Sequence, residues 1–337
     1  MKPRILITAL FATAGLFAAG CGGADDSTDD SSFASSSSGE GGAQLSLVAY
    51  STPEVVYDEI IPDFQKTPEG EGVEFKTSYG ASGEQSRAVE AGLAADYVSF
   101  SIEPDMTRLV EAGIVDAAWK DATDSTGLVT TSLVSFIVRK GNPKGIKTWD
   151  DLLKDGVEVI TPNPFTSGAA KWNLLGAYAH GGIEYVEELI TDHVKVQPKS
   201  GRDALTAFTG GQGDVLLSYE YEATTAQKKG EELDYVIPDD TVKIDITLAT
   251  TKDAPEAAAT FLQYVLSDPA QQRFADWGYR PVNEAVLTKN KDKFPAPATV
   301  KTIDDLGGWE KVNADLFDEE GGSIAKIEED AGVSTAG

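Results

Sequence analysis

The chain has 337 residues, of which 41% are hydrophobic, and this supplies enough apolar side chain for one large domain or two medium ones. Its formal net charge of −27 makes it strongly acidic. Nucleic acids and anionic membrane surfaces attract clusters of Lys and Arg, so we expect neither as a binding partner. If such an acidic chain binds an anion, local uncharged donors and helix ends have to attract it.

The first 20 residues have the pattern of an export signal. Lys2 and Arg4 precede an apolar run that ends next to Cys21, which is the only cysteine. The run is too short for a comfortable membrane span, and the arrangement resembles a bacterial lipoprotein signal. We therefore expect residues 1–20 to be a signal peptide and Cys21 to be lipidated; the alternative is a lone buried thiol. Residues 21–43 are almost all small or acidic, which predicts a disordered tether.

From residue 44 to about residue 320, short apolar runs alternate with turns and helical patterns. Thr52 is expected to cap the first helix, with Pro53 at its first position. The other expected helices span residues 84–93, 148–152, 169–180 and 255–266, and a further helix follows the turn at 199–203. The expected strands span residues 45–50, 73–78, 97–101, 128–139, 157–161, 213–220 and 242–249. This alternation predicts an α/β fold, in which the chain crosses between two lobes within 128–139 and near 237–243.

One segment, Asn163–Trp172, resembles a turn that presents backbone NH groups at the start of a helix. Ser167 is a good N-cap residue, and the first helical turn behind it leaves several NH donors without an intrahelical acceptor. The helix dipole favours negative charge at the same place, so the segment is a candidate anion site. The alternative is an ordinary capped helix after a proline-rich loop. Ligands of open α/β sheets bind at the carboxyl ends of strands, where several of these turns lie.

Catalytic chemistry has little support in the sequence. His180 and His193 are the only histidines and do not have the spacing of metal ligands, so we expect no metal, no cofactor and no catalytic residues. The turn Gly80–Gly83 lacks the Lys and Ser/Thr of a phosphate-binding loop. Ser167 and Lys171 lie four residues apart and could share a helix face as nucleophile and base, which leaves an exported serine hydrolase as a remote alternative.

Five short segments, taken together and in order, resemble the periplasmic sulfate- and thiosulfate-binding proteins of ABC importers, which are type II solute-binding proteins. The segments are VRKGNP at 138–143, VITPNP at 159–164, GDVL at 213–216, YRP at 279–281 and GGW at 307–309. The resemblance covers residues 45–320. It implies an extracytoplasmic binding protein, not an enzyme, that captures sulfate or thiosulfate and delivers it to an ABC permease. We expect it to be a monomer, either lipid-anchored to the outer face of the cell membrane or periplasmic.

The same resemblance implies a two-lobed periplasmic-binding-protein-like fold with the ligand cleft between lobes that crossover strands join. Residues 45–132 and 243–320 would form lobe 1, residues 133–242 lobe 2, and residues 321–337 a flexible tail. Family members hold the dehydrated anion with backbone NH groups, one serine hydroxyl and one side-chain ring NH, without a cation in contact. By position, the implied ligand-binding residues are Ser51, Ser82, Ser167, Gly168, Ala169, Gly201 and Tyr219.

Within this implied site, Ser167 would supply its hydroxyl, and Tyr219 stands where the family commonly has tryptophan. A phenol can donate to an anion as an indole NH does, although the alternative for Tyr219 is a partly buried strand residue. The other five residues would supply backbone NH groups. Gly83 and Arg202 are expected to support the site without touching the ligand.

Phosphate, molybdate and other tetrahedral oxyanions are the rival ligands. Sulfate carries no proton at neutral pH, whereas phosphate normally carries at least one and is best held by a site that contains an acceptor carboxylate. Glu84 is the residue on which this choice depends, because an inward carboxylate would repel sulfate and accept a hydrogen bond from the OH group of phosphate. The alternative is a solvated glutamate that stabilises the first turn of its helix.

Overall fold

The computed structural model describes residues 42–336. The expected signal segment, Cys21 and nearly all of the tether lie outside these residues. Between residues 42 and 336, every helix is too short or too polar to cross a lipid bilayer.

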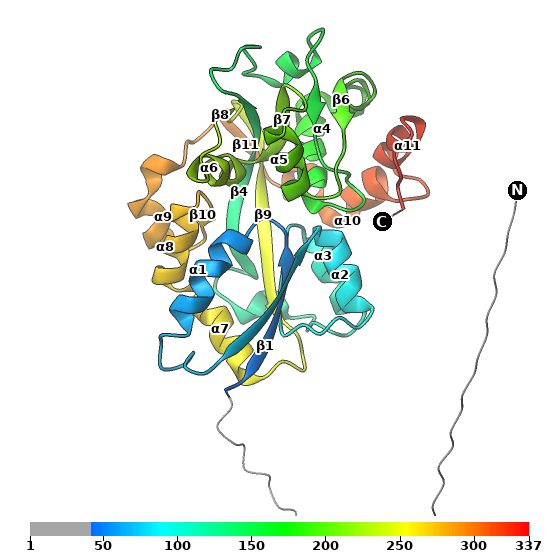
Figure 1. Ribbon diagram of the computed structural model, residues 1–337. Coiled ribbons are helices and arrows are strands. Elements are labelled where there is room, and N and C mark those ends of the chain that lie inside the picture. Colours follow the sequence, from blue (N-terminus) through cyan, green and yellow to red (C-terminus); the bar gives the residue numbers. More distant parts are fainter. Residues whose placement is uncertain (1–41, 337) are drawn as a thin grey trace, which may run out of the picture. The chain divides into compact units, whose positions relative to one another are not determined.

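Strands and helices alternate along the chain (Figure 1), which confirms the α/β class. The strands are β1 (Gln44–Tyr50), β2 (Glu74–Gly80), β3 (Tyr97–Phe100), β4 (Leu128–Arg139), β5 (Val159–Ile160), β6 (Val194–Val196), β7 (Val215–Tyr219), β8 (Leu233–Val236), β9 (Asp240–Thr250), β10 (Arg280–Pro281) and β11 (Thr299–Lys301). The α-helices are α1 (Glu54–Phe64), α2 (Ser82–Glu90), α3 (Glu103–Glu111), α4 (Gly168–Glu188), α5 (Gly201–Thr209), α6 (Glu220–Lys228), α7 (Glu256–Leu266), α8 (Asp268–Asp276), α9 (Glu284–Lys289), α10 (Gly308–Val312) and α11 (Ser323–Asp330). Short 3-10 helices span Trp119–Ala122, Trp149–Leu153, Lys291–Lys293 and Asp304–Leu306, and short π-helices span Leu189–His193 and Asn313–Phe317.

Two long strands, β4 and β9, connect two groups of elements. The strand order is β2-β1-β3-β9-β4-β7-β5-β6, with β8 and β10 also paired to β4 and β11 paired to β9. Residues 128–133 of β4 pair with β9, whereas residues 134–139 pair with β7 and β8. Figure 1 shows β4 and β9 running from the group of β1, α1 and α7 to the group of β7, α4 and α5. Both groups contain parallel strands, β1 with β2 and β3, and β5 with β6 and β7.

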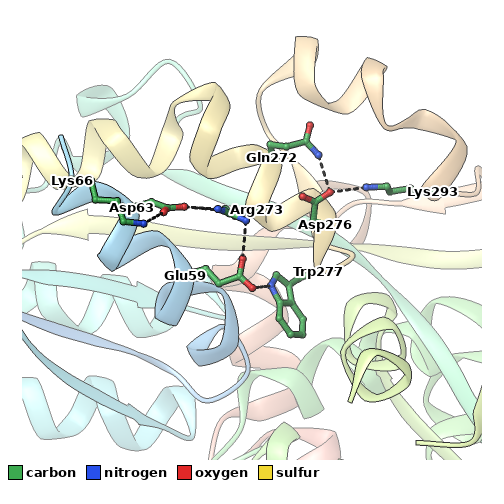
Figure 2. Close-up of polar contacts among 8 residues, drawn as sticks. All are labelled: Glu59, Asp63, Lys66, Gln272, Arg273, Asp276, Trp277 and Lys293. Atoms are coloured by element: carbon green, nitrogen blue, oxygen red, sulfur yellow. Dashed lines mark hydrogen bonds and ion pairs between the residues drawn. The ribbon is translucent and has the colours of Figure 1, made fainter. Parts of the chain in front are cut away.

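Helix α1 packs against α8 through an apolar face and a surface network. The rings of Tyr57 and Phe274, both buried, lie edge to face at 5.9 Å between centroids. Figure 2 shows a polar network between the same two helices, in which Arg273 pairs with Asp63 at 2.7 Å and with Glu59 at 3.3 Å. Ion pairs at such exposure contribute about 0–1 kcal/mol each, so they orient the two helices more than they hold them.

Two local expectations need correction. Thr52 does not cap α1, because the N-cap residue is Pro53 and the Thr52 hydroxyl lies 3.0 Å from the Tyr221 hydroxyl instead. Residues 323–330 were expected to lie in a flexible tail, but they form α11, in which Ile324 and Ala325 are buried. Apolar side chains at helical spacing give this acidic segment a face that can pack, which its overall composition hides.

Candidate functional site

The starts of three helices meet in one region. The Gly83 NH at the start of α2 donates to the Thr166 carbonyl, in the turn before α4, at 3.2 Å. A Cβ built on Gly201, the first residue of α5, would lie 3.6 Å from the Ala169 Cβ of α4 and 3.5 Å from the Thr52 Cγ2 in the turn before α1. The starts of α2, α4 and α5 and the β1–α1 turn therefore converge, and we call this region the junction.

The junction contains backbone NH groups that have no acceptor within their own helices. Gly168 and Ala169 are the first two residues of α4, and Gly201 is the first residue of α5. NH groups at these positions point out of the helix, where the helix dipole adds positive potential. All three residues are buried, so water does not satisfy these donors freely. The structure thus brings together three of the predicted backbone donors.

The hydroxyl of Ser167 is available beside them. Ser167 is the N-cap residue of α4, and its side chain, 3% exposed, makes no cap hydrogen bond within residues 42–336. Ser200 at the start of α5 behaves differently, because its hydroxyl accepts from the Asp203 NH at 3.1 Å. The α5 cap is therefore used structurally, whereas the Ser167 hydroxyl stays available to another acceptor.

Tyr219, at the end of β7, is fully buried, and its hydroxyl has no hydrogen-bond partner among residues 42–336. Its ring packs edge to face on Tyr50, with 6.4 Å between centroids. Burial raises the pKa of Tyr219 well above its usual range, so the phenol keeps its proton and remains a donor. A buried, protonated and unpartnered hydroxyl is what the predicted donor role requires.

Ser82 and Ser51 lie at the same end of the sheet but differ in their surroundings. The Ser82 hydroxyl is fully engaged, donating to Asp105 at 2.6 Å and accepting the Ser101 NH at 3.1 Å, so only its backbone NH is left for a ligand. Ser51 lines a wider pocket of about 340 Å³ together with Glu84 and Lys199. The Glu84 carboxylate lies 3.7 Å from the Lys199 amine and its side chain is 38% exposed. This placement favours the interpretation of Glu84 as a solvated glutamate.

Arg202 reaches the junction from α5 and contacts backbone there. Its guanidinium donates to the Thr52 carbonyl at 2.8 Å and lies 3.7 Å from the carboxylate of Glu222. Glu222 is fully buried; burial raises its pKa, and Arg202 partly opposes this rise. When Glu222 is ionised it balances the charge of Arg202, so the pair holds the β1–α1 turn without adding net charge to the junction.

A small pocket with cationic side chains adjoins the junction. Its volume is about 60 Å³, and its lining includes Ser167, Gly168, Arg87, Arg108 and Lys171. Burial lowers the pKa of Lys171 to about 8. The Lys171 amine donates to the Asn313 side chain at 3.0 Å and lies 4.9 Å over the Phe317 ring.

Two features of the junction were not predicted from the sequence. Ser101, directly after β3, is buried and its hydroxyl has no partner among residues 42–336. The hydroxyls of Tyr50, Tyr221 and Thr52 form a chain with 3.0 Å contacts behind the β1–α1 turn. Ser101 ends a strand that the sequence predicted, and a polar residue at the carboxyl end of a parallel strand is the signal that could have found it. Across the described range, no three His, Cys, Asp or Glu side chains are placed to hold a metal ion.

The fold consists of two groups of α/β elements joined by long strands, and buried donors lie where the helix starts meet. This arrangement is that of a two-lobed solute-binding protein. Comparisons with known proteins agree. Residues 45–280 match the family described as bacterial extracellular solute-binding protein. The chain is 38% identical to the sulfate-binding protein of Synechococcus elongatus, over 97% of both chains. It is 34% identical to the thiosulfate-binding protein of Pseudomonas aeruginosa, over 80% of this chain and 88% of that one.

Among solved structures, the sulfate-binding protein SubI from Mycobacterium tuberculosis H37Rv is 47% identical, with a TM-score of 0.79, and the match covers 82% of this chain and 100% of that one. The periplasmic binding protein AfuA from Actinobacillus pleuropneumoniae shares the fold at 18% identity, with a TM-score of 0.61 over 72% of this chain and 86% of that one. The chain therefore belongs to the bacterial extracellular solute-binding proteins. The resemblance and the two-lobed α/β fold predicted from the sequence are both confirmed.

Proposed function

We propose that this protein captures sulfate or thiosulfate outside the cytoplasm and delivers it to the permease of an ABC transporter. The observation that carries this proposal is the set of buried, uncharged donors at the junction, formed by NH groups of Gly168, Ala169 and Gly201 and by hydroxyls of Ser167 and Tyr219. The names of the relatives, sulfate-binding and thiosulfate-binding protein, support the same ligand.

The choice of sulfate over phosphate rests on the carboxylates that lie nearby. Asp105 already accepts from Ser82 and pairs with Arg108 at 3.1 Å, and Glu222 faces Arg202. Both oxygens of the Glu222 carboxylate lack a hydrogen-bond partner among residues 42–336, so the proposal requires that Arg202 balances their charge and that neither accepts from the anion. Such a site suits an anion that has no proton to give, because a protonated phosphate would leave its OH group unpaired. Phosphate, molybdate and other tetrahedral oxyanions remain the rivals against which this proposal is tested.

The number of donors is adequate for tight binding. Hydrogen bonds to charged groups contribute roughly 1.5–3 kcal/mol each, and these contributions have to offset the cost of removing a dianion from water. Micromolar affinity corresponds to about 8 kcal/mol. The predicted NH groups of Ser51 and Ser82 would complete the set around the anion, with Gly83 and Arg202 holding their turns. Losing one donor at about 2 kcal/mol would weaken binding more than tenfold.

We also propose how the two lobes divide. Residues 45–132 and 243–298 would form lobe 1, and residues 133–242 together with 299–330 would form lobe 2. The changes of strand pairing after Leu133 in β4 and after Val242 in β9 support these boundaries. We place residues 299–330 with lobe 2 rather than lobe 1, because β11 pairs with the first residues of β9 and the Trp309 ring lies 4.8 Å from the Trp172 ring of α4.

Three further parts of the proposal concern chemistry and location. The protein is a binding protein and not an enzyme, which is supported by the engagement of the Lys171 amine with Asn313 rather than with Ser167. It acts as a monomer whose surfaces around the cleft dock the permease. It is anchored to the outer face of the cell membrane by a lipid on Cys21, which the sequence pattern around that residue supports.

The test is a calorimetric titration of the purified protein with sulfate, thiosulfate, phosphate and molybdate at fixed pH and salt. We expect one equivalent of sulfate or thiosulfate to bind tightly and phosphate to bind negligibly. A preference for phosphate would mean that a carboxylate such as Glu84 turns inward. Absence of binding to any oxyanion, together with turnover of activated esters, would replace the proposal by hydrolysis at Ser167.

A further inference from the structure

Ser101 carries a buried hydroxyl that nothing in the fold explains. The residue is 1% exposed, and its Oγ has no hydrogen-bond partner among residues 42–336. Most buried side-chain hydroxyls in proteins are paired, because leaving one unpaired costs stability. A buried hydroxyl that stays unpaired in the folded protein is therefore a candidate contact for a ligand.

The backbone of Ser101 is fixed on both sides. Its NH donates to the Ser82 hydroxyl at 3.1 Å, and its carbonyl accepts from the Trp172 ring NH at 2.6 Å. These bonds tie the end of β3 to the start of α2 and to α4. The side chain lies directly over the first residue of α4, since a Cβ built on Gly168 would be only 2.1 Å from the Ser101 Oγ. The Ser101 hydroxyl therefore lies next to the residue that begins α4, whose NH has no acceptor in its own helix.

Tyr219 brings a second unpartnered hydroxyl to the same place. The Ser101 hydroxyl is near enough to the Tyr219 phenol to oppose the rise in its pKa that burial causes, although the two hydroxyls do not reach hydrogen-bond geometry. Ser101 arrives on β3 and Tyr219 on β7, so the pair spans the two groups of strands. Two buried hydroxyls without acceptors are both left able to donate to an acceptor from outside the chain.

We propose that Ser101 is a ligand-contacting, specificity-determining residue, whose hydroxyl donates to the same ligand oxygen as the Tyr219 hydroxyl. This inference rests on the proposed binding of a tetrahedral oxyanion at the junction. The shared oxygen accepts two O–H bonds at one vertex of the anion, while the helix starts serve the others. A vertex that meets two donors and no acceptor favours an unprotonated oxygen, and where the other vertices meet donors as well, a protonated anion has to leave its OH group unpaired.

The decisive variant is Ser101→Ala, measured by calorimetry with sulfate and by thermal melting without ligand. Removal of the hydroxyl should weaken sulfate binding about 10- to 100-fold, the range expected for one hydrogen bond to a charged group. The melting temperature of the ligand-free protein should stay the same or rise, because an unpaired buried hydroxyl has been removed. A purely structural serine would give the opposite pattern, with lower melting temperature and unchanged affinity.

Ser99, inside β3 and two residues before Ser101, offers a matched control. It is fully buried like Ser101, but its hydroxyl donates to the Thr247 carbonyl at 2.9 Å. Ser99→Ala should lower the melting temperature and leave sulfate affinity within about twofold, since it loses a paired hydroxyl away from the junction. A double variant of Ser101→Ala with Tyr219→Phe should lose less affinity than the product of the two single losses, because both hydroxyls serve one oxygen.

The outcomes separate this inference from the proposed function. If the unmodified protein binds sulfate and the affinity of Ser101→Ala lies within threefold of it, the assignment of Ser101 is wrong and the proposed function stands. If the unmodified protein binds none of the four oxyanions, the proposed function fails and the assignment of Ser101 falls with it. Strictly multiplicative losses in the double variant would contradict the shared oxygen.

Discussion

Replacing Gly168 by alanine tests the packing of the junction most severely. A Cβ at this position would lie 2.1 Å from the Ser101 Oγ and 3.1 Å from both γ carbons of Ile102. Comfortable contacts between heavy atoms lie near 3.5–4.0 Å, so the structure has to yield by roughly 1 Å. Either the Ser101 side chain rotates away from the ligand or the start of α4 moves outward, and both movements take a donor out of place.

The size of the effect follows from these two costs. Overpacking of a buried site costs about 1–3 kcal/mol, which lowers the melting temperature of a protein of this size by roughly 2–10 °C. Displacing one or two donors by roughly 1 Å stretches their hydrogen bonds beyond useful length and should weaken sulfate binding about 10- to 1,000-fold. Both effects are measurable on the same sample, by calorimetric titration and by melting with and without sulfate.

Gly201→Ala is the matched substitution, because Gly201 is also the first residue of its helix. Its built Cβ meets Thr52 and Ala169 at 3.5 and 3.6 Å, which are ordinary contacts. The NH donor remains in place, so sulfate affinity should fall by at most about threefold. If Gly168→Ala bound sulfate as tightly as Gly201→Ala, the start of α4 would not hold the anion and the reasoning would be refuted.

The remaining predictions concern single side chains. Ser167→Ala should weaken sulfate binding more than tenfold by calorimetry, because a hydrogen bond to a charged group, worth about 2 kcal/mol, is lost. Unchanged affinity would show that the site has been placed wrongly. Burial raises the pKa of Glu328 to about 7, so the folded protein loses stability as pH rises from about 4.5 to 7. Glu328→Gln should therefore be more stable than the parent by about 1–3 kcal/mol at pH 8 but not at pH 4.5. If the difference in melting temperature between the two proteins were the same at both pH values, the assignment would be contradicted. Burial lowers the pKa of His180, but its hydrogen bonds to Asp240 and Asp150 outweigh this and raise it above 6.5. The stability that the histidinium gives is present below pH 6.5 and is lost as pH rises through the raised pKa. An NMR titration of His180 should therefore have its midpoint above pH 6.5. A midpoint below that value would show that the aspartates do not stabilise the protonated ring.

The sequence predicted the fold well where the local pattern of apolar and turn residues agrees with the element that the tertiary structure forms. Apolar runs placed β1, β4, β7 and β9 within a few residues, and the turn at Ser167 marked the start of α4 correctly. Periodicity and turn residues are local properties, so the sequence carries them directly. The helix α11 was missed because its apolar face is short and surrounded by acidic residues, and the helix packs on α4 and on the π-helices Leu189–His193 and Asn313–Phe317, contacts that a local sequence pattern does not show.

The site could be predicted in part for the same reason. Helix starts are visible in the sequence, and the resemblance supplied candidate positions such as Gly168 and Tyr219. Its place at the end of a strand could have marked Ser101 as a candidate, but its unpartnered hydroxyl beside Gly168 could not be predicted, because that depends on positions in space. The pairing of Arg202 with Glu222 is likewise a product of tertiary packing between α5 and α6.

The most direct test of the account is a crystal structure of the protein with sulfate bound. We predict a sulfate at the junction, with oxygens about 2.7–3.2 Å from the NH groups of Gly168 and Gly201 and from the Tyr219 hydroxyl. A sulfate held instead by Arg87 and Lys171 in the adjoining pocket would contradict the central claim, because the anion would then be bound by cations and not by uncharged donors.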